Sequence, residues 1–105
     1  SDLIKMSEIK NCSSLDEIRS EIDVLDTQIV KLIAARSKYV RQAAKFKVSV
    51  EKIKEDSRME AIISHVRGLA ISEEISPNMI GDVYDVMIDE MVETEIAEFQ
   101  NRKQL

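Results

Sequence analysis

Residues 15–46, LDEIRSEIDVLDTQIVKLIAARSKYVRQAAKF, are the stretch that decides the fold. Apolar residues recur there every three or four positions, with no glycine or proline between them, which is typical of one long amphipathic helix. These positions are Leu15, Ile18, Ile22, Leu25, Ile29, Leu32, Ile33, Tyr39, Val40, Ala43 and Phe46. Ser14 followed by Glu17 is a capping-box sequence at the start. We predict a helix of about 32 residues, which would be about 48 Å long.

The length of this helix predicts a partner for it. A compact monomer of about 100 residues has a radius of gyration of only about 13 Å. A helix of about 48 Å must therefore project beyond its own domain, and its apolar stripe needs a cover. A second copy of the chain is the simplest cover, so we expect a homodimer.

The rest of the chain predicts two further helices. Residues 48–56 break the apolar period and suggest a polar connector, after which Ser57 and Glu60 form a second capping-box sequence. A short helix follows, and Ser76-Pro77 then offers an N-cap and a first helical residue for a third helix, to about Phe99. We predict an all-α protein with long, short and medium helices, in which residues 1–12 are an N-terminal arm and residues 13–105 one helical domain.

Composition excludes several classes of protein. The 105 residues carry 15 basic and 20 acidic side chains, a net charge of −5, which argues against nucleic acid or an anionic membrane as a general partner. The chain has 2 glycines and 1 proline, where average usage gives about 7 and 5, so the turns of a sheet protein are missing. One cysteine excludes an internal disulfide framework. With no apolar run near the roughly 18 residues of a membrane span and no visible signal peptide, we expect a cytoplasmic protein.

Three cations fall on or beside the apolar stripe of the long helix. Leu15, Ile22 and Ile29 share one heptad position, and the next residue at that position is Arg36. The adjoining line begins at Arg19 and reaches Lys47. Arg36 has two structural interpretations. Either its aliphatic chain packs against the stripe while the guanidinium stays in solvent, or the guanidinium pairs with a carboxylate. In the functional interpretation, several cations converge in an apolar pocket and bind a dianion. Arginine suits this role because its planar guanidinium binds a carboxylate through two parallel hydrogen bonds. Spacing alone leaves these alternatives open.

Read together, these residues resemble the AroQ class of chorismate mutases, and most of all its branch of isochorismate-pyruvate lyases from salicylate and siderophore pathways. The resemblance runs from about Cys12 to the end of the third helix and is weakest in that helix. Cys12 and the Phe46-Lys47 pair look like the lyase branch in particular. The matching stretches are Leu15-Asp16-Glu17-Ile18-Arg19, Ile22-Asp23-Val24-Leu25-Asp26, Ile29-Val30, Arg36, Tyr39-Val40, Ala44, Phe46-Lys47 and Arg58.

The resemblance implies an intertwined all-α homodimer with two identical active sites and a small-molecule substrate, chorismate or isochorismate. By the family pattern, Arg19 reaches into the site of the partner subunit, and Arg36 holds a substrate carboxylate. Lys47 matches the lysine that contacts the ether oxygen of the enolpyruvyl group. Arg58 matches an arginine that helps to hold the ring carboxylate.

The chemistry that the resemblance implies is pericyclic. Chorismate becomes prephenate by a Claisen rearrangement, and isochorismate becomes salicylate and pyruvate by an analogous transfer within one molecule. Neither reaction needs a nucleophile, a metal or a redox cofactor, so we expect none. The protein has to fold the enolpyruvyl arm over the ring and to place cations where negative charge grows on the breaking ether oxygen.

Three positions depart from a typical mutase. Met59 stands where many mutases carry a glutamate near the ring hydroxyl, and Met91 replaces a small hydroxyl residue. Glu95 stands where the family usually has a glutamine that donates to the ether oxygen. An ionised carboxylate would repel the developing oxyanion, whereas a protonated carboxyl could donate the hydrogen bond. We therefore expect activity to fall as pH rises and Glu95→Gln to flatten that profile, unless Glu95 is solvated or ion-paired.

Apolar side chains at residues 59 and 91 favour the lyase, because isochorismate carries its hydroxyl at ring position 2 rather than 4. We predict an isochorismate-pyruvate lyase with chorismate mutase side activity. Lys47, Arg36 and Glu95 are the predicted catalytic residues, and Arg19, Arg36, Arg58, Met59 and Met91 the predicted substrate-binding residues. The alternatives are a dedicated chorismate mutase and a non-catalytic helical dimer that binds a chorismate-like acid or a partner helix. Charge-neutral substitution of Arg36 separates the classes, since it should abolish turnover in an enzyme and leave a scaffold folded.

Overall fold

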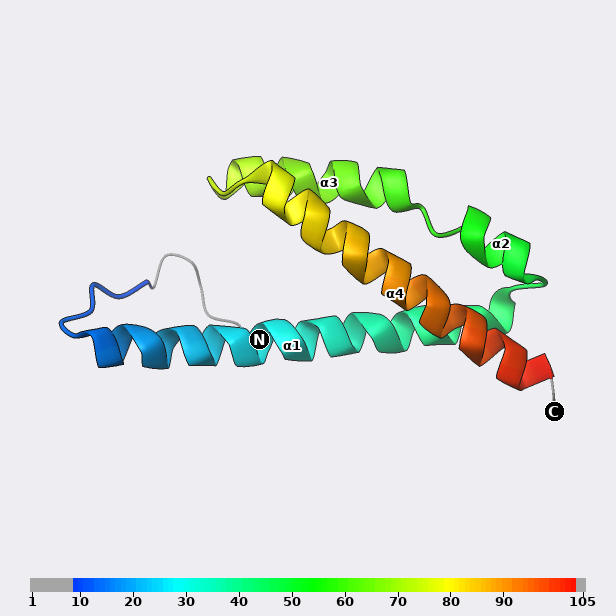
Figure 1. The fold of residues 1–105 in the computed structure, drawn as a ribbon, viewed down its shortest axis with the longest axis horizontal. Helices are drawn as coiled ribbons and strands as arrows, with labels where there is room; N and C mark the ends of the chain where they lie inside the picture. The colour runs from blue at the N-terminus through cyan, green and yellow to red at the C-terminus, as the bar shows by residue number, and fades with distance from the viewer. Residues whose placement is uncertain (1–8, 104–105) are drawn as a thin grey trace. The chain divides into compact units, whose positions relative to one another are not determined.

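The described part of the chain is all-α, as predicted. A computed structural model describes residues 9–103, and every regular element within that range is helical. In chain order these elements are α1 (Leu15–Ala43), the 3-10 helix η2 (Ala44–Phe46), α2 (Val50–Glu55), α3 (Met59–Ser72) and α4 (Pro77–Lys103) (Figure 1). The predicted succession of one long helix, one short helix and a longer third helix is confirmed by α1, α3 and α4.

The start of α1 agrees with the predicted cap at Ser14. The Ser14 Oγ accepts a hydrogen bond from the Glu17 N–H at 3.1 Å. The Glu17 carboxylate reaches back to Ser13, accepting from its N–H at 3.3 Å and from its hydroxyl at 3.1 Å, rather than to Ser14. Two of the unsatisfied donors near the start of the helix are thereby satisfied. The predicted N-terminal arm is without regular structure over residues 9–12, and residues 1–8 lie outside the described range.

The predicted polar connector over residues 48–56 is wrong, because it contains α2. Ser49 caps this helix, with its Oγ accepting from the Lys52 N–H at 3.1 Å. Ile53 is fully buried and packs in a core with Ala44 and Phe99. A helix of six residues is too short to show an apolar period, so only the pair Val50 and Ile53 marks its buried face.

The predicted capping box at Ser57 and Glu60 is also wrong. The N-cap of α3 is Arg58, whose side chain makes no capping hydrogen bond and whose backbone is left-handed, with φ of 56°. Ser57 belongs instead to the end of α2, since its N–H donates to the Lys54 carbonyl at 3.4 Å. A left-handed backbone is unfavourable for any residue with a Cβ atom. The reversal between α2 and α3 is therefore held at some energetic cost.

The turn between α3 and α4 closes without glycine. The Ile75 N–H donates to the Ala70 carbonyl and the Glu74 N–H to the Ile71 carbonyl, with Glu74 left-handed at φ of 61°. This is a Schellman motif in which glutamate occupies the position that glycine usually holds. Ser76 then caps α4 as predicted, accepting from the Met79 N–H at 3.1 Å. The helix runs to Lys103, past the predicted end near Phe99.

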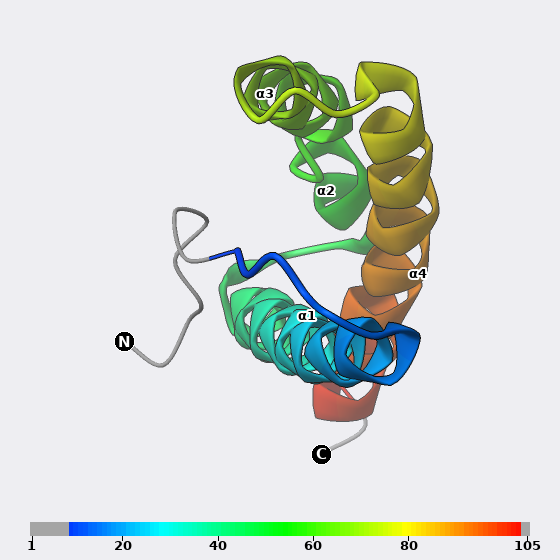
Figure 2. The ribbon, with the colours of Figure 1, turned by 90° about the vertical axis from the view of Figure 1, so that its left-hand side faces the viewer.

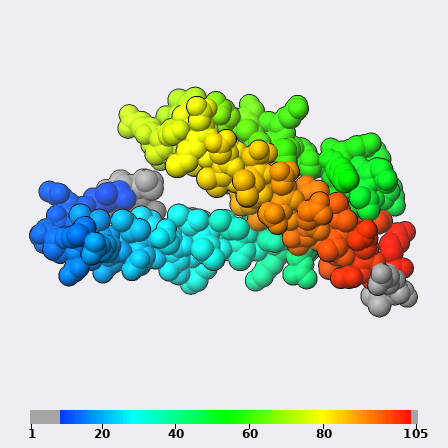
Figure 3. Space-filling model, viewed as in Figure 1, coloured from blue at the N-terminus to red at the C-terminus, as the bar shows by residue number. Residues whose placement is uncertain are grey.

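Helices α3 and α4 run antiparallel and pack along each other, and α2 packs against α4 further along its length (Figure 2). The space-filling view shows the side chains of α3 meeting those of the first half of α4 (Figure 3). The chain divides into two compact units, Ser1–Arg36 and Ser37–Leu105, with the boundary inside α1. The single domain predicted over residues 13–105 stays a prediction. Among the described residues, all the buried side chains belong to the second unit: Ala44, Ile53, Val66, Ala70, Ile88, Met91, Glu95 and Phe99.

Candidate active site

Lys47 lies at the centre of the candidate site. It follows η2 in an extended conformation, and its side chain is only 14% exposed. Its Nζ lies 3.2 Å from Asp56 Oδ2 and 3.6 Å from Glu95 Oε2. Because η2 packs against α4, the stem of Lys47 is covered while the ammonium meets two carboxylates. The lysine is thus held in a defined position between α2 and α4.

Glu95 comes from the buried face of α4. Ile88, Met91, Glu95 and Phe99 are all buried and recur every three or four residues, so they form one stripe along the helix. Glu95 is 6% exposed, which excludes the alternative of a solvated carboxylate. The alternative of an ion pair agrees with the 3.6 Å separation from Lys47. The structure therefore brings together Lys47 and Glu95, two of the residues that the sequence singled out.

The Oε2 atom of Glu95 has unused hydrogen-bonding capacity. It is buried and has no hydrogen-bond partner among the described residues. Its distance to Lys47 Nζ is beyond the usual range for a hydrogen bond to nitrogen. A buried polar atom without a partner is costly, and such atoms often serve a functional site. Oε2 therefore keeps an unfilled hydrogen-bond position next to the Lys47 ammonium.

Asp56 is the residue of the site that the sequence did not indicate. It is the C-cap of α2 and stays half-exposed at its side chain while it binds the Lys47 ammonium. Its position depends on α2, which is itself hidden in the sequence. The usable signal was the pattern Ser49-x-x-Lys52 with apolar residues at 50 and 53, which is a cap followed by one buried turn.

Arg58 and the two methionines occupy different surroundings. Arg58 is exposed at the start of α3. Met91 is buried one turn before Glu95 on the same face of α4. Met59 is half-buried and lines a groove together with three carboxylates, those of Asp89, Glu90 and Glu93. Met91 thus adjoins the Lys47–Glu95 pair along the helix, whereas Met59 lines a separate groove whose charged residues are Lys54, Asp89, Glu90 and Glu93.

Arg19 and Arg36 belong to the unit Ser1–Arg36, whereas Lys47 and Glu95 belong to Ser37–Leu105. Arg19 is exposed and Arg36 is half-buried on α1. Their convergence on the site, Arg19 from the partner subunit, remains a prediction.

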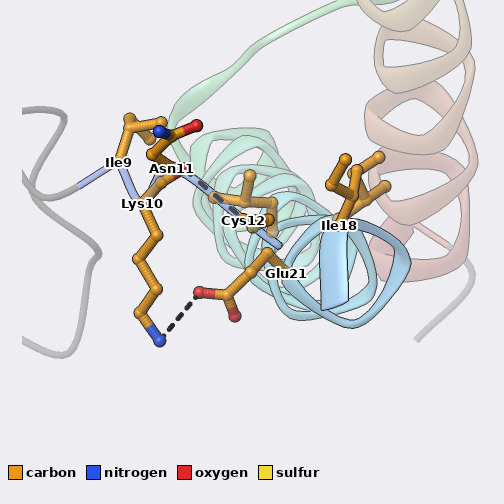
Figure 4. Close-up of a pocket in the computed structure, with 8 residues that line it drawn as sticks. Ile9, Lys10, Asn11, Cys12, Ile18 and Glu21 are labelled. Carbon is orange, nitrogen blue, oxygen red and sulfur yellow. Dashed lines mark hydrogen bonds and ion pairs between the residues drawn. The ribbon is translucent and has the colours of Figure 1, made fainter. Parts of the chain in front are cut away.

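A second pocket lies beside the first turns of α1 (Figure 4). An ion pair of 3.2 Å between Lys10 and Glu21 ties the preceding segment to the helix. Partial burial and the nearby carboxylates of Glu17 and Glu21 raise the pKa of the Cys12 thiol, which lowers its reactivity. No residue predicted for the active site lines this pocket. It is therefore not part of the candidate active site.

The described residues contain neither a metal-binding cluster nor a membrane-spanning helix. Over residues 9–103, no group of three or more histidine, cysteine or acidic side chains is placed to hold a metal ion. Over the same range, no helix combines the length and the apolar character that crossing a membrane requires.

The described residues thus form an all-α fold with a polar site in which a largely covered lysine lies 3.6 Å from a buried glutamate. Residues 18–96 match the family model of chorismate mutase type II, and the chain belongs to this family. A search of curated proteins found no match to the chain. The all-α chorismate mutase fold predicted from the sequence is thereby confirmed, and the chain is an enzyme of the chorismate mutase class.

Proposed function

We propose that the protein is an isochorismate-pyruvate lyase with chorismate mutase side activity. The observation that carries this proposal is the pair formed by Lys47 and the buried Glu95, with Nζ and Oε2 3.6 Å apart, in a chain of the chorismate mutase type II family. Both reactions break the ether bond of an enolpyruvyl group. A fixed ammonium beside a carboxyl that lacks a hydrogen-bond partner suits the oxygen on which charge develops.

The proposed mechanism places the ether oxygen between these two side chains. Lys47 donates a hydrogen bond to the oxygen, and Glu95 donates a second from Oε2 while that atom holds a proton. As the C–O bond of isochorismate breaks, a hydrogen moves from the ring to the enolpyruvyl methylene, which leaves salicylate and pyruvate. In chorismate the same methylene bonds to the ring instead and gives prephenate. The two donors stabilise the oxygen equally in both cases.

Substrate orientation is assigned to the arginines. Arg36 and Arg58 hold the carboxylates, and Arg19 comes from the partner subunit. Bidentate contacts of this kind fix the enolpyruvyl arm over the ring, and orientation supplies much of the acceleration in a reaction within one molecule.

The partner subunit in this proposal is a second copy of the chain. Ile22, Ile29 and Leu32 are each about half-exposed, and no residue of α1 is buried. An apolar stripe of this length on one face of a helix needs a cover, because single exposed apolar residues are ordinary but contiguous patches mark interfaces. The homodimer covers the stripe and places Arg19 in the neighbouring site.

The lyase is preferred because both Met59, at the family position near the ring hydroxyl, and Met91 are apolar. Met91 is buried one turn from Glu95, and Met59 is half-buried. An apolar neighbour gives nothing to a hydroxyl at ring position 4, which chorismate has and isochorismate lacks. A dedicated chorismate mutase is the second candidate, favoured by the match to the mutase family model itself.

One assay tests the proposal. Purified protein is given chorismate in one reaction and isochorismate in another, with prephenate measured in the first and salicylate fluorescence in the second. We expect fast release of salicylate and slow formation of prephenate. Fast prephenate formation without salicylate would make the protein a mutase. No turnover of either substrate would overturn both candidates.

The role of Glu95 predicts a pH dependence. The proposed role requires that Glu95 donates to the ether oxygen as a neutral carboxyl although Lys47 Nζ lies 3.6 Å away, and activity that depends on this proton should fall as pH rises. An amide donates at every pH, and Glu95→Gln should therefore flatten the profile. Rates of both proteins between pH 5 and 8 provide the measurement. A flat wild-type profile over this range would contradict the assigned role.

A further inference from the structure

Three further cations lie around a pocket that Lys47 also lines. The last turns of α4, red in Figure 1, pack against η2 and leave a pocket of about 310 Å³ between them. Four of the six residues that line it are basic, and none is acidic within the described range. The lining residues are Ala44, Lys45, Lys47, Phe99, Arg102 and Lys103.

The pocket combines an apolar base with a charged rim. Ala44 and Phe99 are buried and form the apolar part. The Lys103 ammonium lies 5.6 Å from the centre of the Phe99 ring, and the Lys45 ammonium 5.4 Å from the ring of Phe46. These distances fall within the range of cation–π attraction. Such a surface suits a ligand that carries carboxylates on a carbon ring.

The charges around the pocket leave a positive excess. Asp56 and Glu95 are paired with Lys47, and Glu98 lies 3.7 Å from Arg102 and 3.9 Å from Arg41. Five cations therefore face three carboxylates in this cluster. The five are Arg41, Lys45, Lys47, Arg102 and Lys103. The excess is two positive charges with Glu95 ionised and three with Glu95 protonated, so in either state it favours a dianion.

This excess opposes the charge of the whole chain. A net charge of −5 repels a dianionic substrate at long range. A cleft lined by one sign of charge attracts the opposite sign and raises the association rate about 10-fold to 10³-fold, in a way that salt screens. Because Lys47 belongs to both the pocket and the candidate active site, an anion held here lies next to the reacting group.

We propose that this pocket is an entry subsite that captures a carboxylate of a cyclic dicarboxylate substrate and delivers it to Lys47. Lys45, Arg102 and Lys103 supply the attraction and take no part in bond breaking. The inference rests on the proposed function, since it takes the substrate to be the dianion of that reaction.

The test removes the three rim charges together, as Lys45→Gln, Arg102→Gln and Lys103→Gln. The matched control removes three exposed cations elsewhere, as Lys31→Gln, Lys38→Gln and Lys52→Gln, so that the net charge changes equally. We expect kcat/KM of the first variant to fall about tenfold at low ionic strength and to converge with wild type at high salt, with kcat unchanged. The control should stay near wild type. A charge-conserving variant, Lys45→Arg with Arg102→Lys and Lys103→Arg, should keep the wild-type salt dependence.

Equal kcat/KM in the two glutamine variants, or a loss that salt does not reduce, would overturn the proposal. A measurement without turnover separates this failure from failure of the proposed function. Titration with malonate, a plain dicarboxylate, should move the backbone amide signals of Ala44 and Phe99 in wild type and not in the rim variant. Shifts without turnover would leave the pocket as an anion site and refute the enzyme. Turnover without shifts, and with equal kcat/KM values, would refute the entry subsite alone.

Discussion

The two units of the chain differ in how far their apolar side chains are buried. In the unit Ser37–Leu105, Ile53 is 0% and Phe99 8% exposed, and even a glutamate is buried on α4. On the part of α1 in Ser1–Arg36, Ile22 stays 48% and Ile29 52% exposed. The unit Ser37–Leu105 covers its own core, whereas the apolar stripe of α1 stays exposed in the single chain. In the proposed function, a second chain covers the exposed stripe and completes the site around Lys47 through α1.

The largest effect should come from charging the exposed stripe of α1. Ile22→Glu with Ile29→Glu changes four side chains in a dimer, each stabilising it by about 1.5–3 kcal/mol. We expect the dimer to dissociate, with Kd raised more than about 10⁴-fold, and turnover to be lost. Sedimentation velocity and the two substrate assays measure this. Lys31→Glu, a charge change of the same sign on the same helix, is the control and should leave the dimer intact. A double variant that stays dimeric would contradict the claim that a second chain covers the stripe of α1.

The next effect should come from the core of the other unit. Ile53→Ala removes a fully buried side chain and leaves a cavity, which should cost about 2–5 kcal/mol in the free energy of unfolding. Ile71→Ala makes the same chemical change where the side chain is 66% exposed, and should cost less than about 0.5 kcal/mol. Urea unfolding at one protein concentration compares them. Equal losses would mean that α2 does not contribute to the core.

A smaller change in stability is expected from the two glycines of the unit Ser37–Leu105. Gly68 has open space around it, so Gly68→Ala should stabilise α3 by about 0.5–1 kcal/mol. At Gly81 an added Cβ would lie 3.2 Å from Arg67 Nη1, which donates to the Pro77 carbonyl and to Asn78 Oδ1. Gly81→Ala should therefore be neutral or destabilising. Thermal unfolding of both variants tests this, and equal stabilisation would show that Arg67 moves aside freely.

The local features of the fold could be predicted from the sequence, whereas features that depend on contacts between distant residues could not. The caps at Ser14 and Ser76 could be predicted because each involves residues three positions apart. The predicted cap at Ser57 is wrong, because Ser57 bonds back to the end of α2 and the left-handed residue Arg58 precedes α3 instead. The sequence did not predict α2, because its local signal, the Ser49 cap, begins a helix of only six residues. The burial of Ile53 against Phe99 depends on a residue far along the chain.

The candidate site follows the same rule. The burial of Glu95 was predictable from its spacing to Ile88 and Met91 on one helix. The contact of Asp56 with Lys47 was not, since it depends on the unrecognised α2. The cationic pocket joins Lys45 to Arg102 and Lys103, which only the packing of η2 against α4 brings together.

The most direct test of the account is complementation between two inactive variants. Arg19→Ala keeps Lys47, and Lys47→Ala keeps Arg19. If Arg19 acts in the site of the partner subunit, a mixed dimer contains one intact site, and an equimolar, fully exchanged mixture should regain about a quarter of wild-type activity. Activity no greater than the sum of the two separate variants, in mixtures shown to contain mixed dimers, would contradict a site shared between chains.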